Sequence, residues 1–454
     1  MAALSPTQIT NISNGVSYAS RDSIKDILFD NKSVLSNDEW LNIKNKYIVD
    51  TINRIWQDNQ PGGKIVSKYL GDYIAISSVL HCKDAWDYFS CAISAVLEGN
   101  IYNAIHFAYY AELRATMSFL ASEGIGVFNG INYYVDSTGK CKRFTGNIAT
   151  HKFVWPALNE WSKLVANRNT LLDIVTVHGY SINSWLQGAE MLVGSPLTTT
   201  LAAEWLSRWS LDLQVLSDDH SVRNIVSYNP LDIKKILRYS GNTKKELQFI
   251  IAKWNLSEPS ASEKFRDLDY RLLREALHKF YQDKYPTTTA GRPTMRKFIS
   301  DIFVRIGAPS NATLETFLSS SAKHNNIVLT EILKPAINSG QIINPFSIIA
   351  RSFMLLRISS ASVQDLLNYA GYDKSLLEFW WKDILKKKAI WDISTPPASM
   401  TELWDDVAIS INNLSSTLAP GAAAINPLIL KQSNAEDTIT LKQFQRAHLW
   451  AIGI

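Results

Sequence analysis

The sequence is poor in cysteine, with only Cys82, Cys91 and Cys141 among 454 residues. This odd, sparse set contains no Cys-x-x-Cys pair and no cluster of cysteine with histidine. It therefore argues against a disulfide framework and against structural zinc. Scarce, unpaired cysteines are typical of a reducing compartment.

Long apolar runs are lacking as well. No stretch of 18 uncharged apolar residues occurs, so we expect no membrane span. The first residues, MAALSPTQITNIS, have neither a basic segment nor an apolar core of the kind that a secretory signal needs. These absences predict a soluble, cytoplasmic protein without a membrane partner.

Charge of one sign is not strongly enriched. The chain has 46 Lys and Arg against 42 Asp and Glu, a formal net charge of +4 at pH 7. That balance is mildly basic and falls short of the strongly basic composition of a dedicated DNA-binding protein. A local basic groove stays open as an alternative, because the summed charge does not say where charges lie.

The glycine and histidine motifs of common catalytic sites are missing. Neither GxxxxGK[ST] nor GxGxxG occurs, and HExxH and GxSxG are absent too. Acidic pairs exist at Asp218-Asp219 and Asp405-Asp406. Neighbouring residues on a helix point about 100° apart, so such a pair does not form a shared metal site unaided. We expect no cofactor and no metal site.

Helical periodicity is what the sequence has in abundance. Between residues 80 and 128, apolar residues recur at helical spacing on both sides of Gly99-Asn100, which predicts an antiparallel helix pair joined by a tight turn. Residues 129–149 alternate aromatic and polar residues around Ser-Thr-Gly, which predicts a short hairpin inserted between helices. Helical patterns resume and continue toward the C-terminus, including a dense apolar helix from Phe346 to Leu356. The predicted fold class is all-α and multi-helical, with no βαβ alternation.

The length predicts more than one helical unit, because 454 residues exceed one ordinary core. We divide the chain into a helical extension at 1–78, a helical domain with the hairpin insertion at 79–230, and a C-terminal helical region at 231–454. Within the extension, Ser36-Asn37-Asp38-Glu39 is typical of a helix start, followed by an apolar stripe that includes Trp40 and Tyr47.

One segment carries a family resemblance. The run LEGNIYNAIHFAYYAELRATMSFLASEGI, from Leu97 to Ile125, resembles the first helical hairpin of the HEPN family, in which a glycine turn precedes a helix with Ala-Tyr-Tyr-Ala. The matching residues are Gly99, Tyr102, Ala104, Ala108, Tyr109, Tyr110, Ala111, Leu120, Gly124 and Ile125. Small residues three or four apart also let a neighbouring helix approach closely, while the tyrosines fill the edges of the contact. The resemblance implies a HEPN-like helical bundle over about residues 80–230.

HEPN ribonucleases carry an arginine, a polar residue and a following histidine on their last helix. The arginine holds the scissile phosphate, and the histidine moves the proton of the 2′-hydroxyl group. The resemblance assigns the first two positions to Arg223 and Asn224, ahead of Pro230. Tyr228 stands where the histidine is expected, and His220 lies upstream of the arginine.

Two alternatives follow from this departure. An ordinary phenol has a pKa of about 10 and is a poor general base at neutral pH. The motif is then a degenerate, non-catalytic remnant that still positions helices and binds RNA. Alternatively, His220 and Arg223, three residues apart on one helix face, form the site in altered order.

Two further histidines receive a simpler interpretation. Arg271 and His278 satisfy the bare Arg-x6-His spacing, but a match of this kind is expected by chance, and a leucine occupies the polar position. His151 stands at the start of a predicted helix, and we interpret it as a capping or packing residue.

The resemblance implies a protein of a bacterial toxin or antiphage-defence system. It would engage RNA through Arg223 and Asn224, or a protein partner, as a homodimer or in a heteromeric complex. If active, it would be a metal-independent endoribonuclease with His220, Arg223 and Tyr228 as catalytic candidates. The alternative is a structural or assembly subunit of a multi-protein or viral particle with no nucleic-acid chemistry. Mild charge and the missing histidine favour the alternative, whereas the alanine–tyrosine pattern favours the first hypothesis.

Overall fold

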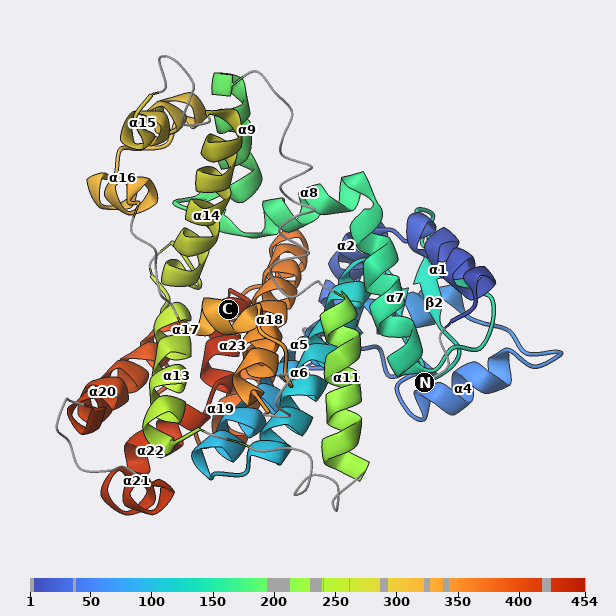
Figure 1. The fold of residues 1–454 in the computed structure, drawn as a ribbon. Helices are drawn as coiled ribbons and strands as arrows, with labels where there is room; N and C mark the ends of the chain where they lie inside the picture. Colours follow the sequence, from blue (N-terminus) through green and yellow to red (C-terminus); the bar gives the residue numbers. More distant parts are fainter. Residues whose placement is uncertain are drawn as a thin grey trace.

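The computed structural model describes residues 4–35, 38–193, 213–228, 239, 241–260, 262–285, 293–321, 327–337, 343–418 and 426–453. Helices account for most of these residues, and the strands are only two or three residues long. The predicted all-α, multi-helical class is therefore confirmed (Figure 1).

The helices of the first half are α1 (Pro6–Tyr18), α2 (Arg21–Asp30), α3 (Lys32–Leu35), α4 (Thr51–Asp58), α5 (Ser67–Leu97), α6 (Ile101–Ser122), α7 (Thr150–Lys163), α8 (Val165–Ile174), α9 (Ile182–Val193) and α11 (Leu213–Tyr228). Those of the second half are α13 (Thr243–Leu256), α14 (Arg266–Lys284), α15 (Met295–Ile306), α16 (Ala312–Ser319), α17 (Ile327–Ile332), α18 (Pro345–Tyr369), α19 (Glu378–Lys387), α20 (Leu403–Ser415), α21 (Pro427–Ser433), α22 (Ala435–Lys442) and α23 (Gln445–Ala451), with short 3₁₀ helices η1 (Met400–Glu402) and η2 (Ser416–Leu418).

Helices α5 and α6 form the central antiparallel pair, as the periodicity predicts. Gly99 takes a φ of 75° in the turn, a left-handed conformation that glycine adopts without steric cost. The Asn100 side chain then accepts a hydrogen bond from the Asn103 amide and caps α6. Because α5 begins at Ser67, the predicted domain boundary between residues 78 and 79 lies inside this helix.

Helix α18 packs against both α5 and α6 and completes the core (Figure 1). It is the one helix in the described part of the chain that is long and apolar enough to cross a membrane, and 89% of its apolar stretch is buried inside the protein. Such burial is typical of the core helix of a soluble protein. The region from residue 231 onward thus shares a core with the predicted 79–230 domain.

A small antiparallel sheet follows α6, with the strand order β1 (Ile125–Gly126), β2 (Tyr133–Val135) and β3 (Cys141–Arg143). Tyr134 pairs with Lys142, and Gly139 turns the chain at a φ of 73°. The hairpin predicted within residues 129–149 is therefore confirmed. A second pair, β4 (Thr176–Val177) with β5 (Tyr180–Ser181), precedes α9.

The helix predicted to start at Ser36–Glu39 is wrong. Ser36 and Asn37 lie outside the described residues, and residues 38–50 form turns and bends. Asp38 has a φ of 61°, which no right-handed helix accommodates. Trp40 instead packs edge-on against Trp380 of α19, which is distant in the sequence, with ring centroids 5.4 Å apart.

Candidate functional site: a histidine–arginine cluster on α6, α7 and α11

One face of α11 carries the residues that the sequence singles out. His220, Arg223, Asn224, Ser227 and Tyr228 recur at intervals of three or four residues along this helix. Residues at that spacing share a face. This face contacts α6 and α7, which lie beside α11 in Figure 1.

Helices α6 and α7 supply the other members. His106, Tyr109 and Tyr110 stand on one face of α6, again at spacings of three and four. His151 is the second residue of α7. We call the assembled group the histidine–arginine cluster; its members are His106, Tyr109, Tyr110, His151, His220, Arg223, Asn224, Ser227 and Tyr228.

Arg223 is the centre of the cluster, and its side chain is only 4% exposed. The guanidinium donates hydrogen bonds to Asn224 Oδ1 at 2.8 Å and to the Tyr110 hydroxyl at 3.0 Å. Its carbon lies 5.1 Å from the ring centroids of both Tyr109 and Tyr110, and 5.7 Å from that of Tyr228. Cation–π attraction of this kind stabilises a cation that has left water.

No carboxylate of the described residues forms an ion pair with Arg223. Its Nε atom is buried and has no hydrogen-bond partner there either. A buried charge without a counter-ion is costly, and an anion that reaches it gains the full attraction. Arg223 therefore gives the cluster a positive charge that the described residues leave without a counter-ion.

The imidazoles lie close to this charge and to one another. The rings of His151 and His220 are stacked, with centroids 5.4 Å apart and an interplanar angle of 24°. His151 Nδ1 lies 2.9 Å from the Tyr109 hydroxyl, and His151 Nε2 lies 3.5 Å from a guanidinium nitrogen of Arg223. His106 Nδ1 lies 2.7 Å from the Ser227 hydroxyl, a contact that ties α6 to α11.

The surroundings lower the pKa of all three imidazoles. Burial, the neighbouring His151 and the Arg223 charge lower the pKa of His220 to about 4. Burial and the same arginine also lower the pKa of His106 and of His151. The imidazoles are therefore neutral at pH 7 and able to accept protons. Shifted pKa values of this kind cluster at functional sites.

The solvent side of the cluster is aromatic. Tyr228, the last residue of α11, is 70% exposed. Tyr110 stacks on Tyr88, with centroids 5.3 Å apart and an interplanar angle of 26°. Flat rings at a partly exposed surface are suited to stacking against the bases of single-stranded nucleic acid.

One member of the acidic pair beside the cluster, Asp219, forms an ion pair away from the cluster. Asp219 is fully buried and forms a two-pronged ion pair with Arg351 of α18. In the part of the chain that the structure describes, no group of His, Cys, Asp and Glu is arranged to hold a metal ion.

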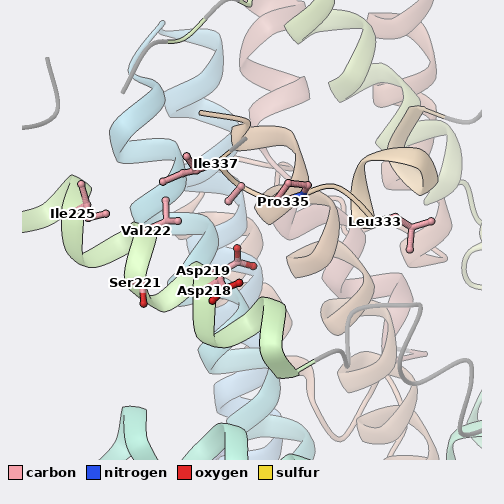
Figure 2. Close-up of a pocket in the computed structure, with 9 residues that line it drawn as sticks. Asp218, Asp219, Ser221, Val222, Ile225, Leu333, Pro335 and Ile337 are labelled. Atoms are coloured by element: carbon pink, nitrogen blue, oxygen red, sulfur yellow. The ribbon is translucent and has the colours of Figure 1, made fainter. Parts of the chain in front are cut away.

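A cavity of about 470 Å³ lies on another face of α11 (Figure 2). Its walls come from α11 and from the segment that links α17 to α18: Asp218, Asp219, Ser221, Val222, Ile225, Leu333, Pro335, Ala336 and Ile337. No member of the histidine–arginine cluster lines this cavity.

The second arginine–histidine candidate does not assemble. Arg271 forms an ion pair with Asp267 at 2.8 Å, one turn earlier on α14. His278 Nε2 lies 2.8 Å from the Leu318 carbonyl oxygen. Each side chain is therefore held by a partner of its own. Pro230, the expected helix stop, lies outside the described residues.

Sequence reasoning assigned Tyr109 and Tyr110 to helix packing and did not single out His106. His106 could have been found, because it lies three and four residues before these tyrosines and so shares their helix face. His151 gave no such signal. It begins a helix and is a packing residue, as predicted, and the structure shows that it packs against Tyr109 and lies beside Arg223.

No family model matches the chain, and neither a curated protein nor a solved structure matches it.

Proposed function

We propose that this protein engages RNA and that the histidine–arginine cluster is its phosphate-binding surface. The observation that carries the proposal is the uncompensated charge of Arg223, surrounded by three imidazoles and three tyrosine rings. A phosphodiester group would supply the missing counter-ion, and arginine is well suited to phosphate because its donors match the spacing of the phosphate oxygens.

Single-stranded RNA fits the surroundings better than a duplex does. Tyr228 and the stacked Tyr88–Tyr110 pair present aromatic rings that splayed bases can stack on. The net charge of the chain, +4, is mild and falls short of the strongly basic composition that is typical of proteins that bind duplex DNA. We therefore expect a short single-stranded segment, with Asn224 available to hydrogen-bond beside the phosphate.

The lowered imidazole pKa values give the proposal a signature. An approaching phosphate stabilises the protonated form of each nearby imidazole, so binding takes up protons wherever the free imidazoles are neutral. His220 is neutral down to about pH 4 in the free protein. RNA affinity should consequently rise as the pH falls from 7.5 to 5.5.

Metal-independent cleavage of the bound RNA is the finer alternative, and the facing pair of His151 and His220 favours it. One imidazole would remove the proton of a 2′-hydroxyl, whose oxygen attacks the adjacent phosphorus. The bond to the 5′-oxygen then breaks, and the other imidazole, which takes up a proton when the phosphate binds, gives that oxygen the proton, leaving a 2′,3′-cyclic phosphate and a 5′-hydroxyl. Arg223 would stabilise the added negative charge.

The HEPN resemblance supports a setting for this activity. We propose a cytoplasmic protein of a bacterial toxin or antiphage-defence system, working as a homodimer or with a protein partner. The competing reading is an assembly subunit without nucleic-acid chemistry. The 4% exposure of Arg223 favours it, because a guanidinium already bonded to Tyr110 also serves to hold helices together.

The test is equilibrium binding of a fluorescently labelled, single-stranded RNA 20-mer in EDTA, followed by anisotropy and by gel analysis of the RNA. Arg223→Ala is compared with Arg271→Ala, a matched control from the arginine–histidine pair that does not assemble. Each folded variant is verified by circular dichroism.

We expect Arg223→Ala to weaken binding at least tenfold and Arg271→Ala to weaken it less than twofold. New fragments ending in a cyclic phosphate, lost in His151→Ala and in His220→Ala, would establish cleavage. Equal affinity of the wild type and Arg223→Ala, or no binding at all, would overturn the RNA proposal in favour of the assembly subunit.

A further inference from the structure

Arg351 of α18, in the C-terminal region, forms an ion pair with a residue of α11. Its Nε donates to Asp219 Oδ2 at 2.7 Å, and its Nη2 donates to Asp219 Oδ1 at 2.6 Å. Both side chains are buried, at 2% and 0% exposure. The partners are 132 positions apart in the sequence, so the pair exists only in the folded chain.

Arg351 is itself held rigidly. Its remaining guanidinium nitrogen donates to the carbonyl oxygens of Ile332 and Lys334 at 3.1 and 2.9 Å. These bonds to the backbone at the end of α17 therefore fix the direction in which the guanidinium group of Arg351 meets Asp219. A planar, two-pronged contact fixes the angle of its partner as well as its distance.

A second carboxyl group beside the pair does not compete with Asp219. Glu112 of α6 is fully buried, and its Oε1 lies 4.0 Å from Arg351 Nε. Burial and the neighbouring Asp219 carboxylate raise the pKa of Glu112 well above its ordinary value. The neutral form of Glu112 is therefore favoured, and both hydrogen bonds from Arg351 to a carboxyl group go to Asp219.

The position of Asp219 decides what this contact does. Asp219 directly precedes His220 and stands one turn before Arg223 on α11. Val222, on the same side as Asp219, is buried in the core. Arg223 lies one turn after Asp219 on nearly the same side of the helix, and His220 projects about 100° from Asp219, so fixing Asp219 against α18 also fixes the directions in which His220 and Arg223 project.

We propose that Arg351 is a positioning residue for the histidine–arginine cluster, which sets the rotation of α11 through Asp219. The proposal rests on the proposed function for its RNA readout. It also means that the cluster is incomplete within residues 79–230, since the side chain that orients it comes from the C-terminal region.

The same helix offers a matched control. Arg357 of α18 forms an equivalent buried pair with Asp269 of α14, with bonds of 2.9 and 2.7 Å. Within the described part of the chain, Asp269 forms no side-chain hydrogen bond or ion pair with α11. Replacing either arginine by lysine keeps the charge and removes the two-pronged geometry.

The experiment compares Arg351→Lys with Arg357→Lys in the full chain. The first readout is the affinity for the labelled single-stranded RNA. The second is the NMR signals of the His151 and His220 imidazoles, assigned with His151→Gln and His220→Gln. The second readout needs no RNA and would not respond to a general loss of stability in a folded variant.

We expect Arg351→Lys to shift both imidazole signals and to weaken RNA binding at least fivefold. Arg357→Lys should leave the signals in place and change affinity less than twofold. Should Arg351→Lys fail to fold, Asp219→Asn and its control Asp269→Asn replace the two variants. Unshifted imidazole signals in Arg351→Lys, or equal shifts in both variants, would overturn the positioning role. Shifted signals in a protein that does not bind RNA would sink the proposed function and leave the positioning role standing.

Discussion

Two regions of this molecule keep an arginine out of water by different means. On α18, Arg351 and Arg357 each meet a buried aspartate through two hydrogen bonds. On α11, Arg223 is equally buried, but its hydrogen-bond partners among the described residues are neutral groups, which include the Tyr110 hydroxyl and the Asn224 side-chain oxygen. A charge that serves the fold is paired inside the fold, because an unpaired buried charge costs several kcal/mol. The unpaired one is therefore the one to examine for a role outside the fold.

The largest expected difference between the paired arginines and Arg223 is in the free energy of unfolding. Arg357→Met leaves Asp269 buried and unpaired, so it should lower the free energy of unfolding by about 3–5 kcal/mol. Arg223→Met removes a charge that has no counter-ion, and its effect should stay within about 1 kcal/mol. Urea unfolding followed by circular dichroism measures both. Equal losses for the two variants would mean that Arg223 is a structural cation after all.

The contribution of the tyrosine hydroxyl groups to the stability of the cluster can be measured separately. Tyr109→Phe removes the hydroxyl that lies 2.9 Å from His151 Nδ1 and should cost about 1–2 kcal/mol, because the partner is left partly buried without its bond. Tyr228→Phe, at a ring that is 70% exposed, should stay within about 0.5 kcal/mol. The same unfolding experiment serves both variants. A costless Tyr109→Phe would show that this hydroxyl does not stabilise the cluster.

The histidine–arginine cluster should also make stability depend on pH, through His220. The pKa of His220 is lowered to about 4 in the fold, while an unfolded histidine titrates near pH 6.5. The unfolded chain therefore binds more protons between these values, so the His220 contribution is complete above about pH 6.5 and is lost as the pH falls toward 4. Allowing for solvent screening at this half-buried ring, the loss should be about 1 kcal/mol. His220→Gln should flatten the profile of unfolding free energy between pH 6.5 and 4; an unchanged slope would place the titration elsewhere.

Salt gives the smallest and most specific effect. Each phosphate neutralised by a protein cation on a single strand contributes about 0.7 to the slope of log affinity against log salt. Arg223→Ala should reduce that slope by about this amount, whereas Arg271→Ala should leave it unchanged. The slope is measured by repeating the binding titration at potassium chloride concentrations from about 50 to about 300 mM. Equal slopes in all three proteins would separate Arg223 from the phosphate.

Local sequence patterns predict the central helix pair and the hairpin. The α5–α6 pair and the β2–β3 hairpin follow from periodicity and turn residues that lie next to each other in the chain. The failed helix at residues 38–50 has helical spacing too, but Trp40 is held by a partner on α19, some 340 positions away. Long-range contacts of that kind leave no trace in a local pattern.

The cluster divides in the same way. His220, Arg223, Asn224 and Tyr228 are predictable as one face of one helix, because their spacing is written in the sequence. His151 arrives from 72 positions upstream of Arg223, and Arg351 reaches Asp219 from 132 positions downstream. Only the packing of α6, α7, α11 and α18 brings these groups together, and without that packing His151 is an ordinary helix-start residue.

Photo-crosslinking locates the RNA most directly. A single-stranded RNA carrying 4-thiouridine is irradiated with the full-length protein, and the attached peptides are identified by mass spectrometry. The account predicts attachment within α6, at the start of α7 and at the Tyr228 end of α11, with loss of all three in Arg223→Ala. Attachment confined to other helices, or equal yields with Arg223→Ala, would contradict it.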